Sequence, residues 1–202
     1  MKSNNELKVK DAIYEAALTL FAEKGFHGVS MRDVTGLAEC NVSAINYHYQ
    51  SKEVLYNLCL YNNWDDFSYI LNHTLQDVST YSEFCDKIRY TIYHSLNHLV
   101  NNPHKFQLIS RELYESSLSI EDNPLAEMEK IVTSLEYFIK KAQDKNFIQQ
   151  KLDPKFIASF ILETCFIRGV IFFRRSNKDE KGINFTVQTT DQIFTLLFSG
   201  LH

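Results

Sequence analysis

Glycine and proline are scarce in this chain, which has six glycines and three prolines in 202 residues. Both residue types mark turns and loops, so their scarcity is typical of helices joined by short turns. The chain is also 45% hydrophobic and 13% aromatic, which excludes a disordered chain and allows a sizeable core. We therefore expect an all-α fold.

The sequence also lacks the patterns that carry metals or catalysis. Its four cysteines are scattered, without a C-x-x-C pair or a histidine at ligand spacing, so we expect reduced thiols that pack as small apolar groups. These cysteines are Cys40, Cys59, Cys85 and Cys165. No serine–histidine–acid or cysteine–histidine arrangement, phosphate-binding glycine loop or pair of catalytic carboxylates is recognisable. We therefore expect neither an enzyme nor a metal or cofactor.

A signal peptide and a membrane span are not expected either. The N-terminus is polar and leads directly into an amphipathic segment. The longest apolar run, Phe156 to Phe173, contains Glu163 and Arg168, and charges at mid-span are costly in lipid. A helix that a partner buries explains this run better, and we expect a cytoplasmic protein.

Apolar residues at three- and four-residue steps predict a first helix from Glu6 to Lys24. Gly25 is its expected C-cap, and Phe26 can supply the hydrophobic contact that often accompanies such a cap. This helix is expected to support the structure formed by the residues that follow it.

Two short helices are predicted next. Ser30, with Asp33 three residues on, is an acidic variant of the capping box and predicts a helix that runs to about Ala38. After a break, Asn41 is a good N-cap for a third helix from Val42 to Tyr49. Two short helices separated by three or four residues make a helix-turn-helix, and the first helix completes a module of about fifty residues.

The rest of the chain is predicted to be almost wholly helical. The polar stretch Ser117 to Asn123 and the charged stretch Ser176 to Asn184 are expected to break it. The expected helices run from Ser51 to about Val78, Ser82 to Val100, His104 to about Ser116, Pro124 to about Asp144, Asp153-Pro154 to Arg174, and about Thr190 to Leu201. We expect a DNA-binding domain over residues 1–50 and a helical domain over residues 51–202.

The third helix has two distinct faces. Ile45 and Tyr49 are four residues apart, so they share a face that should pack, with Cys40, on the first two helices. The opposite face carries Val42, Ser43, Asn46 and Tyr47. Asparagine can bond adenine bidentately, serine suits several base edges and valine can touch a thymine methyl, so this face suits a major groove.

Other side chains near this helix suit the DNA backbone. Tyr47 and His48 are more suited to phosphate or edge contacts, and Lys52 stands at the start of the fourth helix, where its ammonium and free N–H groups could meet a phosphate. Ser30 and Arg32 could do the same from the second helix. The alternative for Tyr47 is a core aromatic, as Tyr49 is expected to be, and the alternative for His48 is a structural histidine.

The net charge of −4 alone would point away from nucleic acid. Residues 1–52 contain six basic and six acidic side chains, so they form no basic patch in bulk. No acidic residue occurs from Cys40 to Lys52, however, so the presumed DNA face is free of local repulsion. Affinity would then depend on neutral hydrogen bonds, helix N-termini and a few lysines, with modest salt dependence.

The residues from Met31 to Ala38 and from Asn41 to Tyr56 resemble the DNA-binding signature of the tetracycline-repressor (TetR) family. Ala16-Ala17, Leu20-Phe21 and Gly25-Phe26 match that family's first helix. The string from Ala44 to His48 resembles the subgroup akin to CecR, as does, more weakly, Arg111-Glu112-Leu113. The resemblance implies about nine helices, a homodimer joined by the last two helices of each chain, operator DNA as partner and release by a small organic effector.

Three positions depart from that family's pattern. Glu39 stands in the turn where the family usually has glycine, and a left-handed backbone there would strain a glutamate. Tyr49 replaces the usual phenylalanine, and Thr35 replaces the usual alanine. The turn is therefore expected to differ or to hold some strain.

Aromatic and polar side chains on the later helices are candidates for an effector pocket. They are Trp64, Phe67, Tyr90, Tyr93, His94, Phe106, Arg111, Tyr114, Phe138, Phe166 and Arg168. His94, Arg111 and Arg168 could orient an anionic or hydroxylated ligand. The alternative for the aromatics is the core, and for the charged groups a salt bridge.

Two other functions fit a DNA-binding chain of this kind. One is a chromosome-bound factor that contacts a protein partner through the acidic stretches Glu121-Asp122 and Asp179-Glu180, which could equally be solvated loops. The other is a transcriptional activator.

Overall fold

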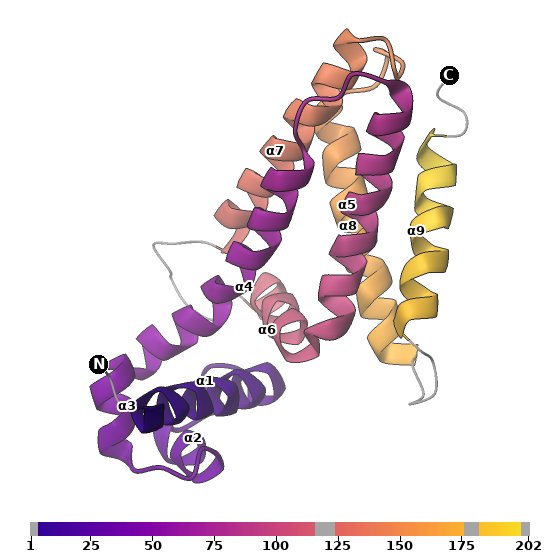
Figure 1. Cartoon of the computed structure of the whole chain (residues 1–202). Helices are drawn as coiled ribbons and strands as arrows, with labels where there is room; N and C mark the ends of the chain where they lie inside the picture. The colour runs from indigo at the N-terminus through magenta and orange to yellow at the C-terminus, as the bar shows by residue number, and fades with distance from the viewer. Residues whose placement is uncertain (1–3, 116–123, 176–181, 199–202) are drawn as a thin grey trace. The chain divides into compact units, whose positions relative to one another are not determined.

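The computed structural model describes residues 4–115, 124–175 and 182–198, and these ranges form nine α-helices without a strand (Figure 1). The all-α prediction is confirmed for them. The helices are α1 (Asn4–Lys24), α2 (Met31–Leu37), α3 (Val42–Tyr49), α4 (Lys52–Thr74), α5 (Tyr81–Asn101), α6 (Pro103–Glu115), α7 (Pro124–Asp144), α8 (Pro154–Arg175) and α9 (Gly182–Phe198).

The helices form two compact units. The first comprises Met1–Asp65 and His104–Leu125, and the second comprises Asp66–Pro103 and Ala126–His202. The compact units therefore divide the chain within α4, and not at residue 50 where the sequence suggested a boundary. As a functional division, residue 50 stays a prediction.

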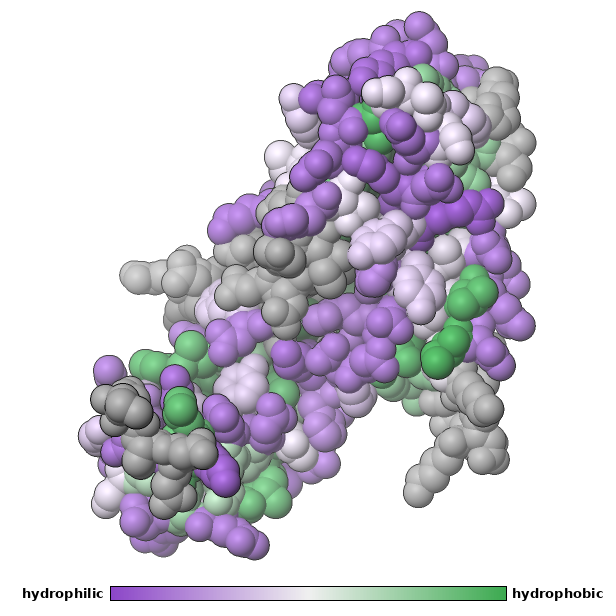
Figure 2. All heavy atoms as spheres, viewed as in Figure 1, coloured by the Kyte–Doolittle hydropathy of each residue, from purple (hydrophilic) through white to green (hydrophobic). Residues whose placement is uncertain are grey.

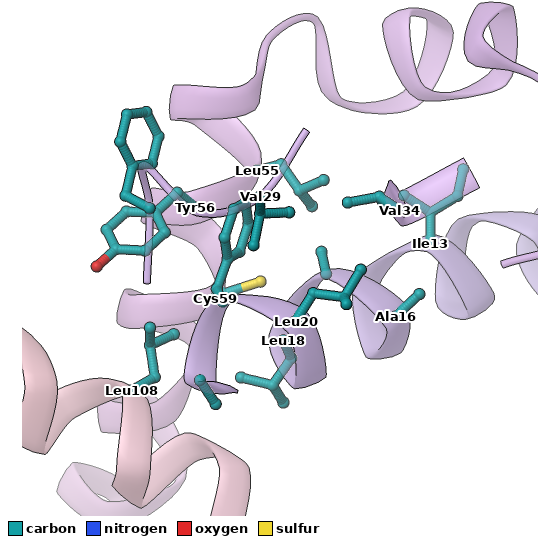
Figure 3. Close-up of a cluster of buried hydrophobic side chains, with 14 of the residues drawn as sticks. Ile13, Ala16, Leu18, Leu20, Val29, Val34, Leu55, Tyr56, Cys59 and Leu108 are labelled. Atoms are coloured by element: carbon teal, nitrogen blue, oxygen red, sulfur yellow. The ribbon is translucent and has the colours of Figure 1, made fainter. Parts of the chain in front are cut away.

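The core of the first unit explains why it extends past the helix-turn-helix (Figure 3). Side chains from α1 and α2 meet Leu55 and Tyr56 of α4, which are both fully buried. Leu108 of α6 is part of the same cluster and is also fully buried. The three-helix module thus packs on the start of α4 and on α6.

The second unit is built around α5, which packs against α8 and α9 (Figure 1). The ring of Phe84 stacks on Phe138, with centroids 5.6 Å apart, and meets Phe198 edge-on at the same distance. All three rings are almost fully buried. Phe138, a candidate for the effector pocket, is thus a core residue of this unit.

The last helix begins earlier than the sequence suggested. Residues 182–184 were predicted as loop and the helix from about Thr190, whereas α9 starts at Gly182. Thr186 and Thr190 are buried and donate their hydroxyls to the carbonyls four residues back, which satisfies them inside the helix. A β-carbon at Gly182 would collide with Val100 of α5, so glycine allows this close start. The remainder of the predicted loop, 176–181, and residues 199–202 lie outside the described residues.

The fourth helix ends earlier than predicted, at Thr74 and not near Val78. Lys145 donates to the carbonyl of Val78 and pairs with Asp77 at 3.0 Å, while the Val78 side chain is buried. These tertiary contacts hold Asp77 and Val78 outside the helix, which local helical periodicity does not reveal.

The cysteines pack as the composition suggested. None of the four cysteines, all of which the structure describes, forms a disulfide, and Cys59 and Cys165 are buried. Burial raises the pKa of the Cys165 thiol to about 12, which keeps it protonated and unreactive. Among the described residues, no group of histidine, cysteine and carboxylate side chains could hold a metal ion.

Within the described residues, one helix, over Pro154–Arg174 of α8, is long and apolar enough to cross a membrane by length and composition. Only a third of its most apolar window is buried within the chain. Exposed Glu163 lies near its middle, which a lipid core disfavours. The apolar surface of α8 therefore needs a cover other than the chain's own core.

Candidate DNA-binding surface

The second helix begins with a complete capping box. The backbone N–H of Asp33 donates to Ser30 Oγ at 3.2 Å, and the Ser30 backbone N–H donates to Asp33 Oδ2 at 2.8 Å. The Ser30 hydroxyl also donates to Asp33 Oδ2 at 2.6 Å. These hydrogen bonds from Ser30 hold the pKa of the Asp33 carboxyl below its ordinary value. The predicted cap of α2 is confirmed.

The turn between α2 and α3 contains a left-handed residue. Glu39 has φ 51°, in the region that a side chain with a β-carbon rarely adopts. The next N–H, that of Cys40, donates to the Thr35 carbonyl at 3.1 Å, which closes the end of α2. The prediction that the turn holds some strain at Glu39 is therefore confirmed.

Relieving that strain should stabilise the first unit. We expect Glu39→Gly to raise the free energy of unfolding by about 0.5–1 kcal/mol, because glycine reaches this backbone conformation freely and the relief outweighs its larger unfolded-state entropy. Urea unfolding followed by circular dichroism measures this. The matched control is Glu39→Ala, which removes the same charge and keeps a β-carbon. Equal stabilisation by both variants would show that charge, and not φ, is responsible.

The third helix is fixed by one buried face. Asn41 caps it by accepting the N–H of Ala44 at 2.9 Å, as predicted. Ile45 is fully buried and Tyr49 is 3% exposed, so both side chains belong to the core of the first unit. The Tyr49 hydroxyl donates to the carbonyl of Lys10 in α1 at 2.8 Å, and burial raises the pKa of this phenol. This contact fixes the rotation of α3 about its axis.

The opposite face of α3 is exposed, as the pattern predicted. We call Val42, Ser43, Asn46 and Tyr47 the α3 ridge. Tyr47 is 70% exposed and Val42 is 42% exposed, and Ser43 and Asn46 are also exposed. An exposed tyrosine and valine beside two hydrogen-bonding side chains offer both apolar and polar contacts to base edges. The alternative of a core position is excluded for Tyr47.

The side chains predicted to meet phosphates are placed differently from one another. Arg32 is exposed on α2, whereas both donors of Ser30 bind Asp33. His48 is half-buried, with its ring 4.9 Å from the ring of Tyr47. Lys52 places its ammonium 4.2 Å above the ring of Phe26. Their contacts to DNA stay predictions, of which that of Ser30 is the least favoured by its hydrogen bonds.

The link from α3 to α4 is a feature that the sequence does not predict. Gln50 has φ 65° and ψ −57°, and the N–H of Ser51 donates to the Tyr49 carbonyl at 2.7 Å. These values define a γ-turn of the rare, strained kind. Glutamine gives no sequence signal for such a turn. The turn joins the buried Tyr49 directly to Ser51, which caps α4 by accepting the N–H of Val54.

Only part of the candidate effector set is brought together. Tyr90, Tyr93 and His94 lie on one stretch of α5, with the rings of Tyr90 and His94 3.9 Å apart. Tyr90 and Tyr93 line an open groove of about 330 Å³ between α5 and α9. Burial lowers the pKa of His94, so its ring is neutral at neutral pH. A neutral ring does not supply the positive charge expected for an anionic ligand.

The other candidates are dispersed over both units. Phe106 and Arg111 belong to the first unit, where the Arg111 guanidinium donates to the Glu23 carbonyl at 3.1 Å. In the second unit, Phe166 is half-buried, and Arg168 lies 6.0 Å from the ring of Phe185. The side chains of Trp64, Phe67 and Tyr114 lie outside the described part of the structure. A role in effector binding stays a prediction for all of them.

Known DNA-binding regulators are similar in sequence to the segment that contains α2 and α3. Residues 13–59 match the model of bacterial regulatory proteins of the tetR family. The biofilm operon icaADBC HTH-type negative transcriptional regulator IcaR of Staphylococcus epidermidis is 32% identical over 69 residues, which are 34% of this chain and 36% of IcaR. The HTH-type transcriptional repressor DhaR of Mycobacterium sp. strain GP1 is 23% identical over 96% of this chain and 92% of its own. This chain thus spans little more than a third of IcaR but nearly all of DhaR.

Solved structures share the fold along nearly the whole chain. AibR, in complex with isovaleryl coenzyme A and operator DNA, has a TM-score of 0.73 at 21% identity and covers 94% of this chain and 98% of its own. FadR from Bacillus subtilis, in complex with stearoyl-CoA, has a TM-score of 0.73 at 18% identity, with 95% and 99% covered. The segment that matches the family model contains the capped helices α2 and α3. Residues 13–59 are thus similar to the bacterial regulatory proteins of the tetR family, and the chain shares the fold of these solved structures.

Proposed function

We propose that this protein is a transcriptional repressor that binds a palindromic operator as a homodimer and is released by a small organic effector. The observation that carries the proposal is the exposed α3 ridge on a helix whose other face is buried. Relatives support repression, since IcaR is described as a negative regulator and DhaR as a repressor. AibR, which has the same fold, is described in complex with operator DNA.

In this proposal α3 enters the major groove with the ridge facing the bases. Asn46 would bond an adenine edge, Val42 would touch a thymine methyl and Ser43 would bond a neighbouring base. Tyr47 lies farther along the helix, where its hydroxyl would reach a phosphate or a base edge. Because Tyr49 holds α3 to α1, the whole first unit would position this ridge on DNA.

The dimer in this proposal forms through α8 and α9. Phe156 and Ile167 of α8 are 60% and 48% exposed and lie 11 residues apart, which places them on one side of the helix. Ile183 and Val187 are 68% and 46% exposed and lie one turn apart on α9, where Figure 2 shows hydrophobic surface at the start of the helix. Apolar helix faces of this kind are typically covered by a second copy.

Lys52 supplies an electrostatic contact to a DNA phosphate in the proposed complex. We expect Lys52→Ala to weaken binding to all sequences alike and to lower the slope of log affinity against log salt by about one per operator half-site, because one phosphate contact is lost. Fluorescence anisotropy at several salt concentrations measures both quantities. A variant that alters base preference and leaves the salt slope unchanged would contradict the phosphate contact.

The effector in this proposal is an acyl-coenzyme A. The support is the pair of regulators of the same fold described with isovaleryl coenzyme A and stearoyl-CoA. Isovaleryl-CoA and stearoyl-CoA can be titrated into the complex of protein and operator, with free coenzyme A as the control. Release by an acyl form but not by free coenzyme A supports the proposal. If neither acyl form releases DNA, the effector assignment is wrong while DNA binding stands.

Selection of duplexes from a random library with the full-length protein tests DNA binding itself. We expect enrichment of a palindrome whose half-sites lie about one turn of the double helix apart, roughly 34–36 Å. Genome-wide occupancy then separates a repressor, at few promoters, from a chromosome-bound factor, at many dispersed sites. Transcription from an occupied promoter should rise when the gene is deleted, and a fall would identify an activator. Failure to enrich any duplex would overturn the proposed function.

A further inference from the structure

A buried carboxylate on α6 has no part in the proposed contacts to DNA. Glu112 is 5% exposed, and its Oε2 accepts a hydrogen bond from the Tyr56 hydroxyl of α4 at 2.6 Å. Burying a carboxylate is costly unless it is hydrogen-bonded, so a short bond to a buried tyrosine is a specific arrangement. Arg111, next in the chain, donates to the Glu23 carbonyl near the end of α1. Glu112 thus attaches α6 to α4, and Arg111 attaches α6 to α1.

The Tyr56 ring continues the contact toward the proposed DNA surface. It meets Phe21 edge-on at 5.0 Å and Phe26 at 5.1 Å, with interplanar angles of 87° and 68°. The Phe26 ring in turn carries the Lys52 ammonium 4.2 Å above its centroid. A cation over an aromatic face is attracted electrostatically to the ring. Contacts therefore run without a gap from Glu112 through Tyr56 and Phe26 to Lys52.

We infer that Glu112 is a positioning residue for the Lys52 ammonium. The inference rests on the proposed function, because it concerns where Lys52 meets a phosphate. The Glu112–Tyr56 hydrogen bond fixes the tilt of the Tyr56 ring, and the edge of that ring sets the position of Phe26. The face of Phe26 is where the ammonium lies, so the bond on α6 determines the position of a charge on α4.

A double-mutant cycle on the full-length protein tests this inference. The variants are Tyr56→Phe, Lys52→Ala and the double variant, and the probe is a duplex enriched with the unaltered protein. We expect Tyr56→Phe to weaken binding three- to tenfold and to lower the salt slope. In the Lys52→Ala background the same change should have less than a twofold effect, because the positioned charge is gone. Effects that multiply in the double variant would overturn the inference and leave the proposed function intact.

The matched control is Tyr49→Phe, which also removes a hydroxyl bond from the core of the first unit. Its effect on binding should multiply with that of Lys52→Ala, since Tyr49 is not in the contact chain. If Tyr56→Phe does not fold, Glu112→Gln preserves the shape and replaces it in the cycle.

A second readout needs no DNA. The ring current of Phe26 shifts the ε-methylene protons of Lys52 upfield in the NMR spectrum, and Glu112→Gln should reduce that shift. An unchanged shift in a folded variant also overturns the inference. If the unaltered protein enriches no duplex, the proposed function fails, and the inference fails with it.

Discussion

The substitution Ile167→Glu should separate the protein into single chains and remove operator binding. Ile167 is 48% exposed on the apolar side of α8, where the proposed second copy packs. A two-fold interface would bury the new carboxylate twice, and burying a charge without a partner costs about 3 kcal/mol or more. This corresponds to a loss of dimer affinity of at least about 100-fold. Sedimentation equilibrium measures the mass, and anisotropy measures binding to the selected duplex.

The matched control for this variant is Leu152→Glu. Leu152 is 40% exposed in the same unit but lies in the segment between α7 and α8, outside the helices of the proposed interface. The control should remain a dimer and bind DNA as before. A dimeric Ile167→Glu variant with normal DNA binding would exclude this face of α8 as the interface. Unaltered protein that is monomeric at micromolar concentration would exclude the dimer altogether.

The bounds of the helix-turn-helix could be predicted from sequence because its caps are local. Ser30 with Asp33 and Asn41 with the Ala44 N–H form hydrogen bonds within three residues, so the residue types alone indicate where α2 and α3 begin. The exposed ridge followed from the same logic, since Ile45 and Tyr49 fix which face is buried.

The parts that could not be predicted depend on distant contacts. The start of α9 depends on burial of Thr186 and on the approach of Gly182 to Val100, whereas threonine-rich sequence is a weak helix former by itself. The membership of α6 in the first unit depends on Leu108 and on the Tyr56–Glu112 bond, which joins residues 56 positions apart. Periodicity within a helix carries no information about such a partner.

Of the two strained residues beside α3, one could be predicted from the sequence and the other could not. Glu39 could be suspected because glycine is usual at its position in the family that the sequence resembles, and its φ of 51° agrees. Gln50 has φ 65° without any comparable signal. Strain of this kind persists where surrounding structure holds it, here between the buried Tyr49 and the cap at Ser51. Both strained residues flank α3, the helix proposed to read DNA.

Replacing Asn46 by alanine tests the proposed reading of bases most directly. Asn46 is exposed on the α3 ridge, and its side chain has both a donor and an acceptor for an adenine edge. We expect Asn46→Ala to cost about 1–3 kcal/mol of binding free energy per half-site and to relax the preference at one base pair of each half-site. Repeating the duplex selection with the variant, and measuring affinity for all four bases at that position, gives both results.

The loss cannot be attributed to unfolding, because alanine has the higher helix propensity and Asn46 contributes no side chain to the core. The matched control is Asn101→Ala, an exposed asparagine at the end of α5 in the other unit, which should leave binding and base preference unchanged. Lys52→Ala, by contrast, should weaken all duplexes alike. If Asn46→Ala also weakens all duplexes alike, Asn46 contacts the backbone and α3 does not read bases through this residue. If the variant changes neither affinity nor preference, the ridge does not face the groove.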